Sequence, residues 1–171
     1  MMKKNLILIG FMGAGKTSVG QALAGKLGWP LSDTDQMIEN EAGMPIARIF
    51  EEKGEQAFRE IETAVLKRLI QEADETVISV GGGLPLREEN RRLLDTLGQT
   101  VFLQVKPETV IARLAGDTTR PLLSGDHVEE RVRELLAYRN PIYRDAAGIT
   151  VDVDGKEVSR IAEEICREAG L

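Results

Sequence analysis

The sequence predicts an α/β protein in which a parallel β-sheet carries helices on both faces. Short apolar runs alternate with segments whose apolar residues recur every three or four positions, as expected when strands alternate with helices. A glycine-rich turn follows the first apolar run and leads into a helical segment. The length of 171 residues suits one domain, and no linker rich in Pro, Gly and Ser divides it. We therefore expect residues 1–171 to form a single three-layer domain.

Five apolar runs are interpreted as strands. The first, Leu6 to Ile9, is continuously apolar and ends in glycine, which is typical of a strand buried on both faces. The second run is weaker and leads into two aspartates, and the third is followed by three glycines. The predicted strands are residues 6–9, 30–32, 76–80, 100–105 and 149–153.

Helices are predicted between these strands. Apolar residues at four-residue spacing predict a helix over 17–27, and an apolar face predicts a longer one over 55–73. Pro107 suits the first turn of a helix after the fourth strand, whereas we expect Pro141 to interrupt a helix. An amphipathic helix over 157–169 closes the chain.

Two stretches, 43–62 and 116–126, leave the strand–helix alternation. Segments that depart from a regular α/β core are where substrate sites and lids are often built. We therefore expect function to involve these two stretches as well as the sheet.

The composition excludes some function classes. Acidic residues outnumber basic ones 28 to 22, which gives a net charge of −6 and argues against a general nucleic-acid binder. Small anions remain possible ligands, because a few placed arginines can bind them. The single thiol, Cys166, cannot form an internal disulfide, and it favours a reducing, cytoplasmic setting.

The N-terminus contains features of a signal peptide, with Lys3 and Lys4 before an uncharged run and Ala22-Leu23-Ala24 after it. Glycines break that run, and Lys16 separates it from the supposed cleavage site. No stretch approaches the roughly 18 apolar residues of a membrane span. We expect a soluble cytoplasmic protein with no membrane or nucleic-acid partner.

The turn after the first strand matches G-x-x-x-x-G-K-[ST] at every fixed position, over Gly10 to Thr17. Glycines let consecutive backbone N–H groups surround phosphate oxygens, and the following helix adds its N-terminal partial charge. Lys16 is expected to reach the β- and γ-phosphates of ATP, and the Thr17 hydroxyl to ligate Mg²⁺. The residues predicted to bind ATP in this segment are Met12, Gly13, Ala14, Gly15, Lys16, Thr17 and Ser18.

This motif specifies triphosphate binding and nothing finer. A GTPase would carry N-K-x-D, and no Asn in this chain precedes Lys. A transporter-type ATPase would carry L-S-G-G, and residues 123–126 read L-S-G-D. Asp33 and Asp35, after the second strand, are the nearest candidates for an acidic metal ligand and for a base that accepts a hydroxyl proton. An alternative role for Asp35 is the N-cap of a helix that begins near Gln36, and capping and catalysis can coexist.

Several arginines are candidate anion ligands, although each alone is typical of a solvated surface charge. Arg59 lies three residues before Glu62 on one side of the long predicted helix, a spacing that also suits an ordinary ion pair. Arg120 lies in an irregular stretch seven residues after Arg113, and Arg139 lies near Pro141.

Taken together, these motifs resemble the shikimate kinases over nearly the whole chain. The marks are G-F-M-G-A-G-K-T from residue 10, S-D-T-D from 32, G-E-Q-A-F-R-E-I-E from 54, G-G-G from 81, R-P-L-L from 120 and Y-R-N-P-I-Y-R from 138. The resemblance implies a nucleoside-monophosphate-kinase-like P-loop kinase fold with sheet order 2-3-1-4-5. It also implies a substrate-binding helical region at about 34–62 and a lid at about 114–126.

The implied reaction transfers the γ-phosphate of ATP to the 3-hydroxyl of shikimate, with Mg²⁺ as cofactor, in aromatic amino-acid biosynthesis. Asp33 matches the aspartate linked to Mg²⁺, and Asp35 matches the aspartate that binds the ring hydroxyls and is the candidate base. Arg59 and Arg139 match the pair that binds the substrate carboxylate. The backbone of Gly81, Gly82 and Gly83 matches the glycines beside the ring.

Other site residues follow from the same resemblance. Arg120 matches the lid arginine that moves onto the phosphates, and Arg113 the residue that packs on adenine. Glu62 is expected to orient Arg59, because a guanidinium held by a carboxylate presents a fixed fork to an acid. Phe50 and Phe58 are expected to form an apolar wall, and Lys156 to contact ATP.

Two other functions stay open at this point. One is a gluconate-kinase-like enzyme on the same fold, and the other is a catalytically silent relative that binds nucleotide or shikimate as a sensor. Two separated arginines for one carboxylate and the D-T-D motif favour shikimate, and the presence of Lys16, Asp33, Asp35 and Arg120 favours catalysis. We expect a monomer, since no long exposed apolar stripe demands a partner.

Overall fold

The computed structural model describes residues 4–115 and 127–171. In these residues five strands form one parallel sheet in the order β2-β3-β1-β4-β5. This order confirms the one implied by the family resemblance. The strands are β1 (Leu6–Ile9), β2 (Leu31–Asp33), β3 (Val77–Ser79), β4 (Gln99–Gln104) and β5 (Ile149–Asp152).

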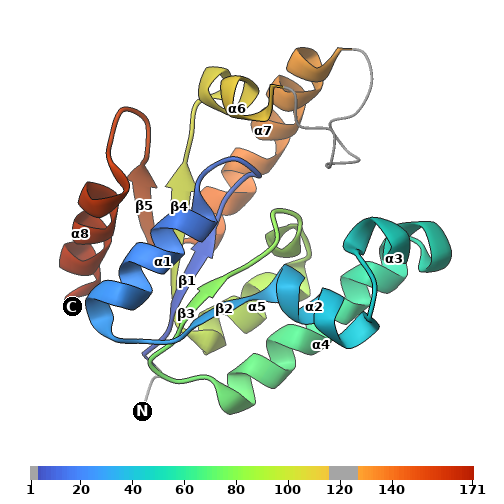
Figure 1. The fold of residues 1–171 in the computed structure, drawn as a ribbon, viewed down its shortest axis with the longest axis horizontal. Helices are drawn as coiled ribbons and strands as arrows, with labels where there is room; N and C mark the ends of the chain where they lie inside the picture. Colours follow the sequence, from blue (N-terminus) through green and yellow to red (C-terminus); the bar gives the residue numbers. More distant parts are fainter. Residues whose placement is uncertain (1–3, 116–126) are drawn as a thin grey trace.

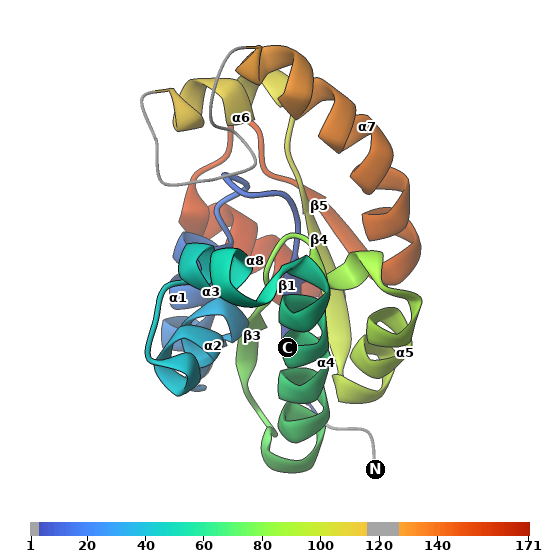
Figure 2. The ribbon, with the colours of Figure 1, turned by 90° about the vertical axis from the view of Figure 1, so that its right-hand side faces the viewer.

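Helices cover both faces of this sheet, which confirms the three-layer prediction (Figures 1 and 2). On one face α1 packs beside α8, and on the other α5 and α7 contact β4 while α4 packs against α5. These five helices are α1 (Lys16–Leu27), α4 (Glu55–Glu72), α5 (Glu88–Leu97), α7 (Val128–Ala146) and α8 (Val158–Ala169). Because both faces are covered, all four residues of β1 are buried, as their continuous apolar run requires.

Shorter helices extend from the carboxyl ends of the strands. Beside β2, α2 (Thr34–Ala42) and α3 (Ile46–Lys53) pack on each other and on α4. A 3₁₀ turn, η1 (Leu84–Leu86), follows β3, and α6 (Pro107–Leu114) packs against α7. In Figure 1, α2 and α3 lie to the right of the sheet while α6 lies above it. The helix that begins at Pro107 confirms that prediction.

The order of the strands determines where a ligand can bind. The chain leaves β1 toward β2 but leaves β3 toward β4, so it departs from these neighbouring strands in opposite directions. The loops beyond their carboxyl ends therefore diverge and leave a crevice, the place where open α/β sheets bind ligands. The phosphate loop follows β1, and the three glycines follow β3.

One expectation about the helices is wrong. Pro141 does not interrupt a helix, because α7 runs through it from Val128 to Ala146. An interior proline removes a helical hydrogen bond and costs about 3 kcal/mol in an isolated helix. Here Leu136 and Tyr143 are buried on either side of it, and burial of such side chains contributes about 1.5–3 kcal/mol each. Packing therefore offsets the local cost.

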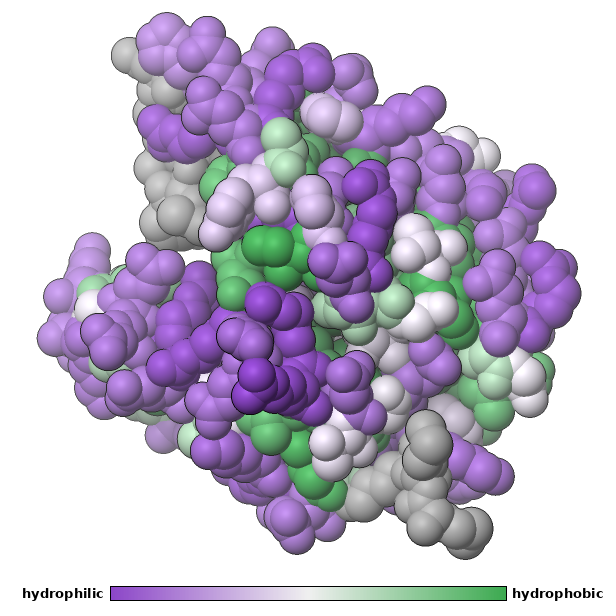
Figure 3. Space-filling view, turned by 180° about the vertical axis from the view of Figure 1, so that it is seen from behind, coloured by the Kyte–Doolittle hydropathy of each residue, from purple (hydrophilic) through white to green (hydrophobic). Residues whose placement is uncertain are grey.

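The described surface is mostly polar. Figure 3 shows one face that is hydrophilic over most of its area, with hydrophobic atoms visible between the polar ones. Among the described residues, the exposed large hydrophobic side chains are Leu31, Tyr138, Val158 and Leu171, which belong to four different elements or ends of the chain. No helix in this part of the chain has the length and apolar character required to span a membrane.

Candidate active site

The segment from Gly10 to Thr17 joins β1 to α1 as a loop that curves around the helix N-terminus. Gly13 and Gly15 have φ values of 85° and 93°, which side chains other than glycine rarely adopt. A Cβ at Gly10 would lie 2.9 Å from the carbonyl oxygen of Leu103, so glycine is also required there for close approach. The fold thus forms the backbone cradle that the motif predicts.

Two cations contact the carbonyl oxygens of this loop. The Lys16 ammonium donates to the oxygens of Gly10 at 2.6 Å and Phe11 at 3.2 Å. Arg113, on α6, donates from Nη1 to the oxygen of Gly13 at 2.6 Å. Both residues therefore contact the phosphate loop, while their contacts with ATP, including that of Arg113 with adenine, stay predictions.

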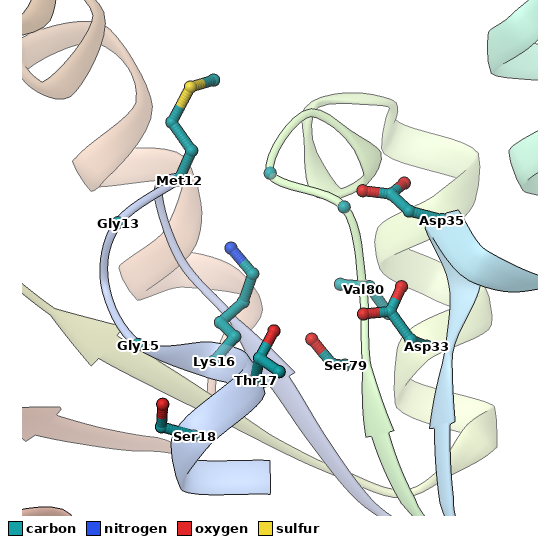
Figure 4. Close-up of a pocket in the computed structure, with 12 residues that line it drawn as sticks. Met12, Gly13, Gly15, Lys16, Thr17, Ser18, Asp33, Asp35, Ser79 and Val80 are labelled. Atoms are coloured by element: carbon teal, nitrogen blue, oxygen red, sulfur yellow. The ribbon is translucent and has the colours of Figure 1, made fainter. Parts of the chain in front are cut away.

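A cavity of about 420 Å³ opens between this loop and the ends of β2 and β3. Figure 4 shows Lys16 and Thr17 on one side of it and Asp33 and Asp35 on the other. Its size falls within the range of small-molecule sites. The residues that line it are Met12, Gly13, Gly15, Lys16, Thr17, Ser18, Asp33, Asp35, Ser79, Val80, Gly81 and Gly82.

The two aspartates occupy different structural positions. Asp33 ends β2 and is the N-cap of α2, where its carboxylate accepts the Gln36 N–H at 3.1 Å. Asp35 lies in the first turn of α2, so the alternative that Asp35 caps the helix is wrong. Asp33 takes that role because β2 ends there, and α2 begins at Thr34 instead of near Gln36. Both carboxylates nevertheless line the same cavity.

The surroundings of Asp35 hold its carboxyl group closer to neutral than usual. Burial raises the pKa of Asp35 above its ordinary value, and the negative charge of Asp33 raises it further. The positive charges of Lys16 and Arg59 act in the opposite direction. A carboxyl group with a raised pKa accepts a proton more readily, which suits a base beside a substrate hydroxyl.

Glycines after β3 let charged side chains approach the backbone closely. A Cβ at Gly81 would lie 2.7 Å from the Asp35 carboxylate, and one at Gly83 would clash with the guanidinium of Arg59. At Gly82 a Cβ would lie 3.5 Å from the guanidinium Nη1 of Arg139 and equally close to the oxygen of Gly10. Because a Cβ at Gly81 would also lie 3.2 Å from Glu62, the fold brings two carboxyl groups and two guanidinium groups to three consecutive glycines.

Arg59 is held from its own helix, α4. Its guanidinium donates to Glu62 at 2.7 Å and lies 3.5 Å from Glu55. Its Cζ lies 5.3 Å from the centre of the Phe58 ring, and that ring lies 4.8 Å from the ring of Phe50. These contacts confirm that Glu62 and Arg59 pair, while the proposed contact of the two phenylalanines with substrate stays a prediction.

Glu62 is the most unusual acid of the site. It is 1% exposed, and its Oε2 has no hydrogen-bond partner in the described part of the chain. Burial raises the pKa of Glu62 to about 7, although the charge and hydrogen bond of Arg59 act to lower it. A neighbouring Asp35 raises it further. Burial thus makes Glu62 harder to ionise than an ordinary glutamate, even beside Arg59.

Arg139 comes from the opposite side, on α7. It is 5% exposed, and its Cζ lies 5.6 Å from the centre of the Phe11 ring. Its Nε is a buried donor with no hydrogen-bond partner among the described residues. A buried guanidinium with an unused donor is a suitable group to bind an anion, because an acceptor would satisfy it.

Not every predicted ligand lies at the cavity. The Lys156 ammonium pairs with Glu164 of α8 at 3.1 Å, so its proposed contact with ATP stays a prediction. The side chain of Ala14 is buried in the core, which leaves only its backbone to face a phosphate. Arg120 and most of the proposed lid lie outside the described residues.

Sequence analysis missed residues that support the glycines. The buried Tyr143 donates its hydroxyl hydrogen to the oxygen of Gly82 at 2.6 Å, and Thr34 accepts the Gly81 N–H at 3.1 Å. Both lie inside motifs that were quoted for other residues, D-T-D and Y-R-N-P-I-Y-R. Their positions in those motifs were the available signal, but their partners became visible only in the fold.

A third support comes from α4 and α5. The Thr63 hydroxyl hydrogen-bonds Asn90 at 2.7 Å, and the Asn90 amide donates to the oxygen of Leu84 in η1 at 2.9 Å. Arg87 donates to both Thr63 and the oxygen of Arg59. This network links the turn of the glycine segment to the helix that carries Arg59. No pattern in the sequence indicated it.

The sheet order, the phosphate loop and the acidic and arginine side chains across the cavity define the class of P-loop kinase folds. Residues 12–169 match the family model of shikimate kinase. A shikimate kinase of Moorella thermoacetica is 44% identical over 164 residues, covering 96% of this chain and 93% of the relative. One of Neisseria gonorrhoeae is 48% identical over 147 residues, 86% of each chain. The chain belongs to the shikimate kinase family, as its motifs predicted.

Solved structures agree with this assignment. A shikimate kinase from Acinetobacter baumannii in complex with shikimate superimposes with a TM-score of 0.92 at 37% identity, covering 97% of this chain and 92% of that one. A gluconokinase from Sinorhizobium meliloti reaches a TM-score of 0.59 at 18% identity, over 99% and 93% of the two chains. The second likeness shows the fold alone, so the shikimate kinase prediction is favoured over the gluconate one.

Proposed function

We propose that this chain transfers the γ-phosphoryl group of ATP to the 3-hydroxyl of shikimate. The observation that carries the proposal is the composition of the cavity and its border. A phosphate loop forms one wall, two aspartates lie opposite, and the guanidinium groups of Arg59 and Arg139 adjoin the glycines at its edge. A triphosphate and a small hydroxy acid are the pair of ligands that these groups would bind together.

The nucleotide side would use the backbone N–H groups of the loop and the ammonium of Lys16. Lys16 contacts carbonyl oxygens of Gly10 and Phe11, so its charge is held at the loop. Bound β- and γ-phosphates would replace these neutral acceptors with charged ones, which form stronger bonds to an ammonium. The charge that develops during transfer would be stabilised at the same place. Arg113, bound to the oxygen of Gly13, would flank the nucleotide.

The residues present fit a magnesium ion that arrives with ATP. Thr17 and Asp33 line the same cavity, and both offer oxygen ligands. The described residues contain no group of three or more His, Cys, Asp or Glu side chains that could hold a metal alone. Mg²⁺ usually takes only one or two protein ligands and completes its shell with phosphates and water. When bound it would neutralise phosphate charge, and Thr17 and Asp33 would hold it, Asp33 through water or directly.

The carboxylate of shikimate would bind to Arg59 and Arg139. These side chains come from different helices and adjoin consecutive glycines, so two guanidinium groups are available to one acid. Glu62 holds Nη1 of Arg59 at 2.7 Å, whereas Nη2 has only a long contact of 3.5 Å with the exposed Glu55, which a substrate carboxylate would replace. The ring would lie beside the backbone of Gly81 and Gly82, which line the cavity and have no side chains of their own.

Asp35 would receive the substrate hydroxyl. Its carboxylate faces the cavity beside Gly81, and its raised pKa comes chiefly from burial. In a loose phosphoryl-transfer transition state the hydroxyl proton leaves late, so orientation of the nucleophile contributes as well as proton acceptance. Asp35 would supply both.

A substrate panel tests this function. ADP release by the purified protein would be followed with ATP, Mg²⁺ and either shikimate, 3-deoxyshikimate, gluconate or no acceptor, and the product identified by ³¹P NMR. We expect turnover and a new phosphate ester with shikimate only. Equal turnover with gluconate, or ADP release that is independent of any acceptor, would contradict the proposal. Binding of shikimate and ATP without turnover would indicate a silent sensor instead.

A further inference from the structure

Thr34 lies between the two aspartates of the cavity but does not itself line it. The residue is 0% exposed, and its hydroxyl accepts the backbone N–H of Gly81 at 3.1 Å. This bond connects the first residue of α2 to the first glycine after β3. It therefore joins the segment that carries Asp35 to the segment along which the proposed substrate ring lies.

The position of this bond follows from the end of the sheet. Strands β2 and β3 pair in parallel as far as Asp33 opposite Ser79, and the next residue of the first segment turns into α2. The amide of Val80 bonds instead to the oxygen of Leu8 in β1. Gly81 thus lies beyond the β2–β3 ladder, and the Thr34 hydroxyl supplies the acceptor for its N–H. A buried N–H without an acceptor would be unfavourable, because it would lose its hydrogen bond to water without gaining another.

The approach between these segments is already close. A Cβ at Gly81 would lie 2.7 Å from the Asp35 Oδ1 and 3.2 Å from the Glu62 Oε2, so the backbone at this point borders two carboxyl groups. Without a bond that holds the backbone, the segments would be expected to separate, and the carboxylate of Asp35 would move relative to the cavity.

We propose that Thr34 is a positioning residue, whose hydroxyl fixes the distance between the Asp35 carboxylate and the Gly81 backbone. The inference rests on the proposed function, because it assigns those two groups to one substrate. Displacement of a reacting group by about 1 Å can cost about 10²-fold in rate. The hydroxyl of Thr34 would therefore influence turnover without touching substrate or nucleotide.

Three variants test the role. Thr34→Val replaces the hydroxyl with a methyl group of similar size, and Thr34→Ser keeps the hydroxyl but removes the methyl. Thr100→Val is the matched control, because Thr100 is 3% exposed on β4 and its hydroxyl has no hydrogen-bond partner among the described residues. Each variant would be characterised by kcat, by KM for shikimate and ATP, and by exchange of the Gly81 amide hydrogen in ¹⁵N-labelled protein.

We expect Thr34→Val to lower kcat by about tenfold or more, with a raised KM for shikimate and little change in KM for ATP. Its Gly81 amide should exchange faster, whereas Thr34→Ser and Thr100→Val should resemble the parent in both measurements. A Thr34→Val protein that is less stable but keeps the parental kcat would overturn the positioning role. An equal loss of kcat in Thr34→Ser would also overturn this role, because it would show that packing of the methyl group matters and not the hydroxyl.

These measurements distinguish failure of the proposed function from failure of the positioning role alone. If the parent protein does not phosphorylate shikimate, both the function and the positioning role are overturned, and Gly81 exchange still shows whether the bond exists. If the parent is active and Thr34→Val has parental kinetics, only the positioning role is overturned.

Discussion

The two sides of the cavity are constructed differently. The phosphate loop is one continuous segment, and its geometry depends on its own residues, such as the left-handed Gly13 and Gly15. The acid side combines Asp35, Arg59 and Arg139 from three helices with the glycines after β3. A local segment can be identified from its pattern, whereas the acid side exists only once the fold has brought four segments together.

The difference extends to how each side is supported. Within the loop, the Ala14 amide bonds to the oxygen of Phe11 and Lys16 also bonds to that oxygen, although Arg113 of α6 supports Gly13 from outside. On the acid side the supports are remote in sequence, as when Tyr143 bonds to Gly82. We therefore expect damage to the loop to come from few positions, each with a large effect. The acid side should show graded effects from many positions.

The largest effect should follow from Lys16→Ala. The ammonium would act on charge that develops during transfer, and such groups are commonly worth about 10²-fold or more in rate. We expect kcat to fall by at least about 10²-fold with an unchanged circular dichroism spectrum. The control is Lys26→Ala, an exposed lysine in the last turn of the same helix, which should keep parental kinetics. Turnover near the parental value in Lys16→Ala would remove the phosphate-loop assignment.

The next effect concerns Asp35→Asn, which tests whether the acid side also takes part in chemistry. The amide cannot accept the hydroxyl proton, and base assistance is typically worth about 10²- to 10⁴-fold. We expect kcat and the affinity for shikimate to fall, with no rescue by added Mg²⁺. A loss much below 10²-fold would indicate that Asp35 mainly orients the hydroxyl. Parental kinetics would exclude both roles.

The matched variant is Asp33→Asn, two residues away. An asparagine can still accept the Gln36 N–H as an N-cap, so α2 should remain intact. If Asp33 holds the metal, activity should need more Mg²⁺ and recover in part when Mg²⁺ is in excess. An identical Mg²⁺ dependence in both variants would show that the two aspartates share one role.

The same contrast explains what could be predicted from the sequence. Leu6 to Ile9 and the helix after it were predicted because periodicity and glycine spacing are local properties. The family motifs also indicated the strand order. The cap of α2 was uncertain because two aspartates stand near its start, and only the end of β2 selects Asp33. The prediction that Pro141 interrupts a helix was wrong, because tertiary packing outweighs the unfavourable effect of proline inside a helix.

The unpredicted parts of the site are contacts between segments. Nothing in the sequence shows that the Tyr143 hydroxyl reaches Gly82, or that Asn90 links Thr63 to η1. The charge state of Glu62 was equally hidden, because its pKa depends on burial that only the fold creates.

Intermediate effects are expected when either substrate arginine becomes lysine. Lysine keeps the charge but loses the planar fork, so Arg59→Lys or Arg139→Lys should raise KM for shikimate by roughly 10- to 100-fold, equivalent to about 1.4–2.8 kcal/mol. KM for ATP should change little. Arg92→Lys, at an exposed ion pair on α5, is the control. Equal weakening of both ligands would show that these arginines serve the nucleotide or the fold instead.

The smallest effect on turnover should come from Glu62→Gln. This variant tests whether Glu62 only holds Arg59 in place or also takes part in phosphoryl transfer. The glutamine oxygen can still accept from Arg59, so we expect a rise of only a few-fold in KM for shikimate and a parental kcat. Steady-state kinetics at several shikimate concentrations would measure both. A kcat loss as large as that of Asp35→Asn would place Glu62 among the reacting groups.

The same variant should have a clear effect on stability that depends on pH. The folded-state pKa of Glu62 is about 7, above the ordinary 4.5, so between these values the folded protein holds a proton that the unfolded chain has lost. Its contribution to stability therefore decreases as pH rises through this window, by on the order of 3 kcal/mol. Glutamine does not titrate, so Glu62→Gln should gain stability relative to the parent as pH rises from 5 to 8. Urea unfolding across this range would measure the difference, with the exposed Glu88→Gln as control. Parallel stability curves for parent and Glu62→Gln would show that Glu62 is charged throughout, held by Arg59 despite its burial.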